Sequence, residues 1–263
     1  RLLDNTKNQK LNKKKKKHLR KQIFLQDENL TIWYTNANGI NSKEESTNNL
    51  LKEEKPDIVT ITETKCTGLP PRIEDYSWFT KNRTSRGGGG VGILVRNELI
   101  PNIRTVDNLE QGEAEILWIR ITGTGTDTVI GVFYGPQEGQ KEDVLEAYGT
   151  VQAHVNSFKR TGERIILTGD FNAKLLIDTP TVQQAQSWNG KQLQKIIKNS
   201  QLEPISLRSS NGIWTRQNRS IPDQKSVIDY IIINKEHIHD VVEITVDEEG
   251  TIRFVSDDAN EPK

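Results

Sequence analysis

The chain has 263 residues, and its 36 basic and 36 acidic side chains give a formal net charge of zero. This length suits one large α/β domain with a sizeable core. The single cysteine, Cys66, excludes an internal disulfide and indicates a reducing compartment. No segment approaches the roughly 18 apolar residues that a membrane-spanning helix needs, so we expect no membrane partner.

The first 28 residues are expected to form a polar, lysine-rich extension. Residues 1–22 contain ten Lys or Arg and one acidic residue, a net charge of +9, which leaves 26 basic and 35 acidic residues for the rest. The extension is expected to attract a polyanion such as nucleic acid, or else to be a solvated tail or a nuclear-targeting signal. We therefore expect a nuclear location. The densest part of the extension is Lys13, Lys14, Lys15, Lys16 and Lys17.

A folded domain is expected over residues 29–263, with short strands and helices in alternation. In chain order, the pattern predicts a strand at 30–34, a helix at 42–55, strands at 57–63, 90–96, 115–122 and 128–134, a helix at 141–160, a strand at 164–168, a helix at 189–199, and strands at 227–233 and 240–247.

Local signals support several of these elements. Ser42 and Glu45 have the spacing of a capping box, Pro56 follows as a stop, and the glycines 87–90 predict a turn. Several strands alternate apolar and polar residues, which favours two packed sheets flanked by helices over a parallel doubly wound sheet. Because the chain contains no methionine, we expect it to be a piece of a longer protein.

Polar side chains follow the predicted strands where each strand ends. Since such ends meet at one rim of a sheet, these residues are expected to share a pocket, in which Mg²⁺ would prefer carboxylate oxygens. Asp170 and Asn172 would point the same way, with Phe171 turned into the core. Taken singly, Asn and Asp after strands are ordinary turn formers, so the argument depends on their joint occurrence. The set is Asn36, Glu63, Tyr134, Asp170 and Asn172.

Asp229 lies inside an otherwise apolar predicted strand. A buried carboxylate without a partner is costly, so Asp229 is expected to have one. The partner is expected to be either a cation in a structural ion pair or a catalytic histidine that Asp229 orients.

Together these residues resemble the endonuclease/exonuclease/phosphatase superfamily. The superfamily includes AP endonucleases, DNase I-type nucleases, phosphoinositide phosphatases and the endonucleases of non-LTR (LINE-type) retrotransposons. The resemblance covers about Leu30 to Lys263 and implies a four-layer α/β/β/α sandwich with two mixed sheets (DNase I-like), with the last strand of the fold expected to be missing. It also implies dependence on Mg²⁺ or Mn²⁺.

The resemblance assigns roles residue by residue. Tyr134 stands where AP endonucleases and LINE enzymes have tyrosine and DNase I-type members have histidine, and the run Gly169–Ala173 looks more like retrotransposon members. DNA contacts are expected from Lys81, Arg83, Arg86 and Ser226 besides the N-terminal lysines. By similarity the catalytic residues are Asn36, Tyr134, Asp170, Asn172 and Asp229, and Glu63 is the metal-binding glutamate.

The last family motif departs from its usual Ser/Thr-Asp-His form. Here the sequence reads Ser256-Asp257-Asp258-Ala259-Asn260. One alignment places Asp258 at the metal position and Ala259 at the histidine. The other matches Asp257 directly, so that Asp258 replaces the histidine. We favour the first because Asn260 then fits as well. His154, His237 and His239 are expected to be surface residues rather than replacements.

The function that this resemblance implies is nicking of one strand of double-stranded DNA to leave a 3′-hydroxyl that primes reverse transcription, impaired here by Ala259. The remainder of a retrotransposon polyprotein would be a partner. The alternatives are an AP endonuclease or a phosphatase of the same superfamily, and a catalytically dead DNA-binding module.

Overall fold

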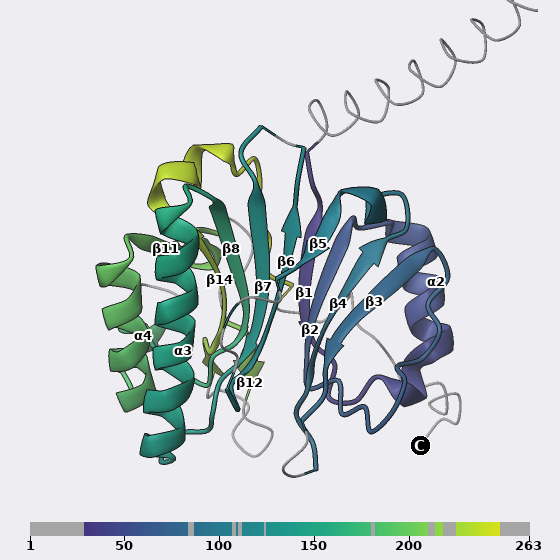
Figure 1. Ribbon diagram of the computed structural model, residues 1–263. Coiled ribbons are helices and arrows are strands. Elements are labelled where there is room, and N and C mark those ends of the chain that lie inside the picture. Colours follow the sequence, from purple (N-terminus) through teal and green to yellow (C-terminus); the bar gives the residue numbers. More distant parts are fainter. Residues whose placement is uncertain are drawn as a thin grey trace, which may run out of the picture.

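Two β-sheets lie face to face in the computed structural model, and helices cover their outer sides (Figure 1). The structure describes residues 29–83, 87–106, 109, 112–123, 125–179, 182–209, 214–217 and 225–247. The arrangement gives four layers, helix, sheet, sheet and helix, and confirms the sandwich with two mixed sheets that the sequence predicts.

The smaller sheet has four strands in the order β1-β2-β4-β3. β1 and β2 are parallel, and β4 is antiparallel to both of its neighbours. Every residue of β2 is buried, which fits its β-branched sequence IVTIT. The bounds are β1 Ile32–Asn36, β2 Ile58–Thr62, β3 Tyr76–Lys81 and β4 Val91–Arg96.

The larger sheet has six strands in the order β11-β14-β8-β7-β6-β5. β7 and β8 are parallel, so their carboxyl ends lie at the same edge, and β14 runs antiparallel to β8. The bounds are β5 Ile103–Thr105, β6 Glu115–Ile121, β7 Thr128–Tyr134, β8 Arg164–Asp170, β11 Leu202–Pro204 and β14 Asp229–Asn234.

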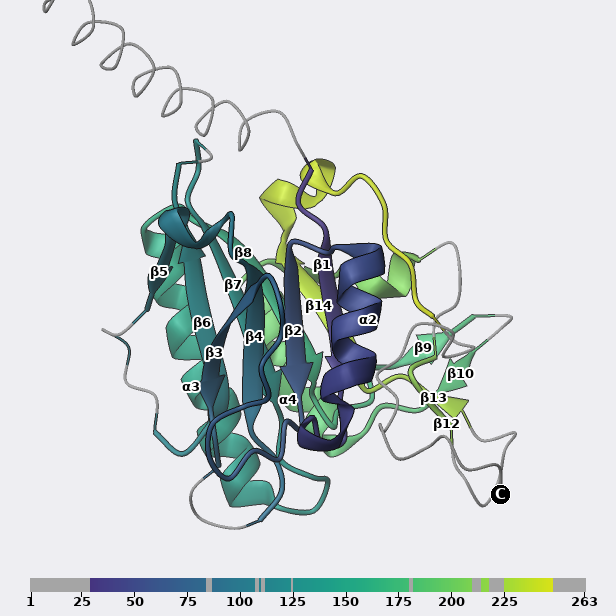
Figure 2. The same cartoon turned by 90° about the vertical axis from the view of Figure 1, so that its right-hand side faces the viewer.

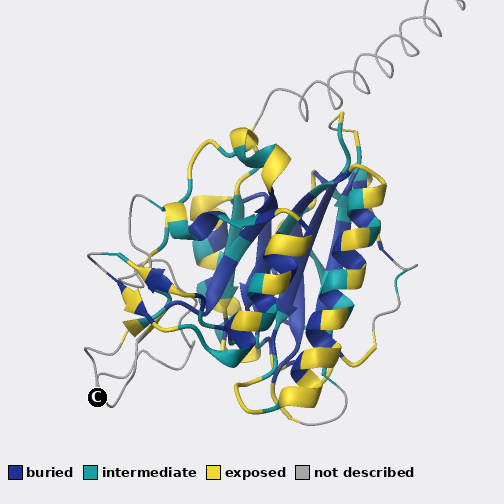
Figure 3. Cartoon of the chain, turned by 90° about the vertical axis from the view of Figure 1, so that its left-hand side faces the viewer, coloured by how far each residue is buried: buried dark blue, intermediate teal, exposed yellow. Residues whose placement is uncertain are grey.

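In the described part of the chain, three helices close the outer layers. α3 (Lys141–Arg160) and α4 (Trp188–Asn199) cover the six-stranded sheet, and α2 (Glu44–Glu54) covers the four-stranded sheet. Figure 3 shows buried strands behind helices whose outward faces are exposed. A third apolar cluster, with Ile93 and Val132 among its members, fills the space between the sheets. Burial of this kind is the main source of stability in such a fold.

Short elements complete the described chain. Two small hairpins lie beside one another at one side of the sandwich (Figure 2). The hairpin strands are β9 Ile177–Asp178, β10 Gln183–Gln184, β12 Arg216–Gln217 and β13 Lys225–Ser226. The 3-10 turns are η1 Asn41–Lys43, η2 Ile100–Asn102, η3 Ile205–Arg208 and η4 Lys235–Asp240.

Most predicted elements are confirmed, and two predictions need correction. The sequence also did not predict β3, β5, β11 or the four short hairpin strands. The strand predicted at residues 240–247 is wrong, because η4 ends at Asp240 and residues 241–247 have no regular structure. The capping box is also wrong, since α2 begins at Glu44 after a 3-10 turn and has no side-chain cap. Within the described residues, no helix is long and apolar enough to cross a membrane.

Candidate active site

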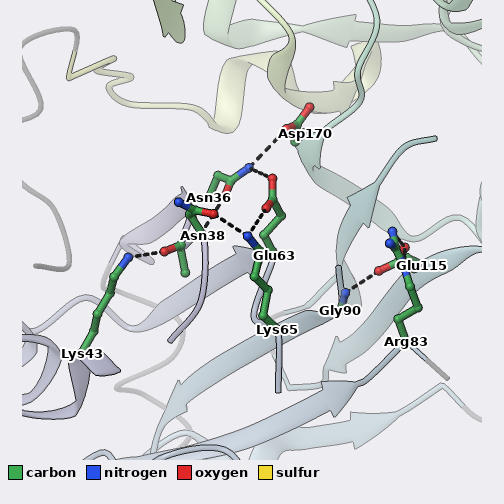
Figure 4. Close-up of polar contacts among 10 residues, drawn as sticks. Asn36, Asn38, Lys43, Glu63, Lys65, Arg83, Gly90, Glu115 and Asp170 are labelled. Atoms are coloured by element: carbon green, nitrogen blue, oxygen red, sulfur yellow. Dashed lines mark hydrogen bonds and ion pairs between the residues drawn. The ribbon is translucent and has the colours of Figure 1, made fainter. Parts of the chain in front are cut away.

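The candidate site lies where the two sheets meet at one edge, at the carboxyl ends of β1, β2, β7 and β8. Asn36 is the last residue of β1, Glu63 follows β2, Tyr134 ends β7 and Asp170 ends β8. Figure 4 shows Asn36, Glu63 and Asp170 converging from three strands. The predicted meeting of these side chains is therefore confirmed for the described residues.

Polar bonds join the two sheets at this edge. Asn36 Nδ2 donates to Glu63 Oε1 at 3.0 Å and to Asp170 Oδ2 at 3.2 Å. Deeper in the interface, Thr168 Oγ1 donates to Thr60 Oγ1 at 2.8 Å. Apolar packing is non-directional, so directional bonds of this kind fix how the sheet edges face each other.

Glu63 belongs to a small polar cluster with Lys65 and Asn38. Lys65 Nζ lies 3.2 Å from Glu63 Oε2 and also donates to Asn38 Oδ1 (Figure 4). Partial burial favours the protonated form of Glu63, but hydrogen bonds from Asn36 and Lys65 and the charge of Lys65 outweigh it, so the pKa of Glu63 is lowered. The carboxylate is thus held ionised.

Two buried aspartates face each other across neighbouring strands. Asp170 and Asp229 are register partners in the β8–β14 pair, and their exposed fractions are 5% and 9%. Burial raises the pKa of both carboxyls, and for Asp170 the charge of Asp229 adds to the rise. Tyr34 donates to Asp229 Oδ1 at 2.5 Å. Among the described residues, Asp229 therefore has the partners that its burial demanded, the hydroxyls of Tyr34 and Thr215, and neither a cation nor a histidine is in ion-pair contact with it.

Gly169 makes the position of Asp170 possible. Its φ is +149°, and an added Cβ would lie 1.9 Å from the carbonyl oxygen of Phe133 on the neighbouring strand β7. Only glycine tolerates both conditions. Phe171 on the other side is fully buried in the core, as predicted.

Asn172 holds the loop after β8 in place. Its backbone is left-handed, with φ 46°, and its backbone N–H donates to Asp170 Oδ1 at 2.9 Å. Its side-chain Nδ2 donates to the carbonyl of Gly135 at 2.8 Å, and Asn189 Nδ2 donates to the carbonyl of Asn172 at 2.9 Å. The side-chain nitrogen of Asn172 thus connects the end of β8 to the segment after β7.

Tyr134 is half-buried beside Glu63. Its hydroxyl is among the groups that hydrogen-bond to the Glu63 carboxyl and lower its pKa. Burial, followed by the charges of Glu63 and Asp170, raises the pKa of Tyr134, so the phenol stays protonated. A protonated hydroxyl at this place is a hydrogen-bond donor.

Three of the residues expected to contact DNA lie in the described part of the chain. Lys81 is half-buried and donates to the carbonyl of Ala114 at 2.8 Å, and burial lowers its pKa. Arg83 is paired with Glu115. Both are bound within the protein, and their contact with DNA stays a prediction. Ser226 lies in the β12–β13 hairpin opposite Arg216.

Several predicted residues lie outside the described residues, and the structure places none of them. They are Lys13, Lys14, Lys15, Lys16, Lys17, Arg86, Asp257, Asp258, Ala259 and Asn260.

Sequence reasoning missed Tyr34, Asn38 and Lys65. Tyr34 precedes Asn36 by two residues, so the strand period of two already places both on one face. Lys65 follows Glu63 by two residues, but both have a left-handed φ of 52°, which no sequence pattern indicated. The prediction that His154 is a surface residue is wrong, because its side chain is buried and Trp118 Nε1 donates to its Nδ1 at 3.1 Å.

The donors at this edge fit a hard divalent cation. The carboxylates of Glu63 and Asp170 both accept from Asn36, and among the described residues Lys65 is the one cation in ion-pair contact with either of them. Oxygen ligands with excess negative charge are what Mg²⁺ prefers. However, the described residues contain no complete cluster of three His, Cys, Asp or Glu side chains arranged around a metal ion.

The sequence was compared with models of known families and with curated proteins. A family model described as the endonuclease/exonuclease/phosphatase family matches residues 34–257. Among curated protein sequences, no significant match is found.

Solved structures share the fold at low sequence identity. A 3′-5′ exonuclease (NExo) from Neisseria meningitidis has a TM-score of 0.63 and 16% identity, over 84% of this chain and 93% of that one. An AP endonuclease from Archaeoglobus fulgidus has a TM-score of 0.57 and 17% identity, over 78% and 87%. The endonuclease domain of TRAS1, a telomere-specific non-LTR retrotransposon, has a TM-score of 0.58 and 16% identity, over 80% and 88%. These likenesses show the fold.

Proposed function

The chain belongs to the endonuclease/exonuclease/phosphatase family, and on that basis we propose that it is built to nick one strand of double-stranded DNA by hydrolysing a phosphodiester. The observation that carries the proposal is the convergence of Asn36, Glu63, Tyr134 and Asp170 on one edge of the sandwich. Nucleases that share the fold support DNA as the substrate class.

Glu63 and Asp258 would hold Mg²⁺ or Mn²⁺. When bound, the ion would stabilise the negative charge that develops on the phosphoryl oxygens. The lowered pKa of Glu63 supports this role, since an ionised carboxylate is ready to accept a cation. Asn36 bonds to both Glu63 and Asp170 and would keep the two carboxylates in a fixed relation.

The remaining residues would act directly on the phosphodiester and the attacking water. As the oxygen of the attacking water bonds to phosphorus, Asp170 would accept a proton from that water. The raised pKa of Asp170 suits a general base. Tyr134 would donate a hydrogen bond to a phosphoryl oxygen. The bond between phosphorus and the 3′ oxygen would break, and that oxygen would take a proton from a solvent water to become a 3′-hydroxyl.

Ala259 bears on that last proton transfer. In the favoured alignment Ala259 stands where the family has its histidine, so we propose that this chain is impaired in cutting. Loss of a general acid or base typically lowers a rate about 10²-fold to 10⁴-fold. The same substitution favours the second candidate function, a DNA-binding module that has lost its chemistry.

We place the activity in retrotransposition, where a 3′-hydroxyl primes reverse transcription. Tyr134, the Gly169–Ala173 run and the shared fold of the TRAS1 endonuclease domain support this proposal. The lysines of residues 13–17 would add affinity for DNA and suit a nuclear location. The remainder of a polyprotein would then be a partner.

A comparison of three substrates tests the proposal. The Ala259→His chain, with Mg²⁺, is given supercoiled plasmid, a duplex with one abasic site and a phosphoinositide, and Glu63→Gln in the same background is the control. The proposal is supported if the Ala259→His chain nicks the intact plasmid and the added Glu63→Gln change abolishes this nicking. Cleavage confined to the abasic duplex, or release of phosphate from the lipid alone, would replace it with one of the alternatives.

A further inference from the structure

We propose that Arg83 and Glu115 form a positioning pair that holds the ring of Tyr134 and the turn carrying Glu63 in place for the reaction. The inference rests on the function proposed above. Arg83 donates from Nε to Glu115 Oε1 at 2.7 Å and from Nη2 to the same oxygen (Figure 4). The two side chains are only 16% and 13% exposed.

Glu115 connects this pair to the backbone near Glu63. Its second oxygen, Oε2, accepts from the backbone N–H of Gly90. The carbonyl of Gly90 in turn accepts from Thr64 N at 3.1 Å, and the carbonyl of Gly89 accepts from Lys65 N at 2.8 Å. A continuous series of hydrogen bonds therefore connects Glu115 to the two residues after Glu63.

The turn that these bonds hold is conformationally demanding. Glu63 and Lys65 both have a left-handed φ of 52°, which costs free energy in a residue that carries a Cβ. Such a backbone persists only where its surroundings fix it. The carbonyls of Gly90 and Gly89 hold the N–H groups of Thr64 and Lys65, and the carbonyls of Glu63 and Thr64 accept from the loop after β1.

Arg83 connects the same pair to Tyr134. The guanidinium carbon of Arg83 lies 5.6 Å from the centroid of the Tyr134 ring, within the range of a cation–π contact. Glu115 is also the register partner of Tyr134 in the β6–β7 pair. The pair thus contacts Tyr134 directly and is connected through Gly90 to Thr64, the residue after Glu63.

Gly89 shows how closely the loop packs on this pair. Its φ is +67°, and an added Cβ would lie 2.4 Å from the guanidinium carbon of Arg83 and 2.5 Å from a carboxylate oxygen of Glu115. A side chain at this position would therefore displace the ion pair. Because partly buried ion pairs add little net stability, the contribution of this pair lies in geometry.

Amide hydrogen exchange tests the positioning without any need for activity. In Glu115→Gln the amides of Thr64 and Lys65 should exchange at least about tenfold faster, because the loop that accepts their bonds is released. The matched control is Glu163→Gln, which breaks the pair between Arg120, also on β6, and Glu163. Unchanged exchange at Thr64 and Lys65, or equal acceleration in the control, would overturn the inference.

A double-mutant cycle tests whether the pair acts through Tyr134. In the Ala259→His background, Arg83→Gln should lower kcat for plasmid nicking about 10-fold to 100-fold with little change in KM, the effect expected of a misplaced reacting group. When Tyr134→Ala is already present, Arg83→Gln should lower kcat by less than about twofold. Independent, additive losses would contradict action through Tyr134.

The two experiments separate failure of the inference from failure of the proposed function. If Ala259→His does not nick DNA, the proposed function fails, and the exchange rates of Thr64 and Lys65 still decide whether the pair positions the turn. If nicking is restored and the exchange rates do not respond to Glu115→Gln, only the positioning role is overturned.

Discussion

Replacement of Asp229 by asparagine should stabilise the metal-free protein at alkaline pH. Asp170 and Asp229 are buried and opposite each other in the β8–β14 register. Side chains in such pairs lie about 5 Å apart. At an effective dielectric constant of about 20, two negative charges at this distance repel by about 3 kcal/mol. Asparagine keeps an oxygen that accepts from Tyr34, so we expect a gain of about 1 to 3 kcal/mol in the free energy of unfolding.

The pH dependence follows from the raised pKa values of both carboxyls in the folded state. A group with a raised folded pKa takes up a proton on folding, so its stabilising effect is complete below the unfolded pKa and is lost as pH rises through the folded pKa. The free energy of unfolding of the parent chain should therefore fall from about pH 5 to about pH 8, by at most about 1.4 kcal/mol per pH unit for each proton. Asp229→Asn should flatten this decline.

Urea denaturation in EDTA at both pH values measures the effect. Asp57→Asn is the control, because Asp57 is a buried acid with a cation partner, Arg96 at 2.6 Å. That change should destabilise the protein at both pH values. If Asp229→Asn also lowers the free energy of unfolding at pH 8, or leaves the pH dependence unchanged, the view of Asp170 and Asp229 as a repelling pair is refuted.

Three further predictions concern other parts of the protein. Tyr34→Phe should lower the free energy of unfolding by about 1 to 3 kcal/mol, because the buried Asp229 loses one of its two hydroxyl partners; a loss no larger than that of an exposed substitution such as Glu53→Gln would contradict this. Asn189→Ala should cost about 2 to 4 kcal/mol, since the side chain is fully buried and bonds to the carbonyls of Pro136 and Asn172; thermal unfolding would show it, and an unchanged Tm would exclude it. Deletion of residues 1–22 should weaken DNA binding and reduce the slope of log K against log salt by about 0.9 for each phosphate that the extension neutralises in the full chain. A fluorescence titration measures this slope, and an unchanged slope would show that the extension takes no part in DNA binding.

Much of the fold could be predicted because periodicity and β-branched runs are local signals. The predicted bounds of β7 (Thr128–Tyr134) and α3 (Lys141–Arg160) coincide with those of the structure. The strand β3 (Tyr76–Lys81) was missed because it mixes aromatic and polar residues without a strict alternation. Residues 240–247 alternate like a strand, yet Val242 is 75% exposed, since alternation alone provides no partner strand.

The site could be predicted only in part, for a similar reason. Positions at strand ends indicated that Asn36, Glu63, Tyr134 and Asp170 meet. No sequence pattern indicated that Tyr34 would reach Asp229 across 195 residues, or that Arg83 would be bound to Glu115. Such pairs depend on how the two sheets face each other, which no local pattern encodes.

The most direct test of the proposed nicking site is to identify the ends produced at the nick. Supercoiled plasmid is incubated with the Ala259→His chain and Mg²⁺, and the nicked product is offered to a DNA polymerase with a labelled nucleotide. We predict nicking at least about 10²-fold above that of the parent chain, with ends that the polymerase extends without prior treatment. Background nicking by Ala259→His, or ends that need removal of a 3′-phosphate before extension, would contradict the assignment of a DNA-nicking site that leaves a 3′-hydroxyl.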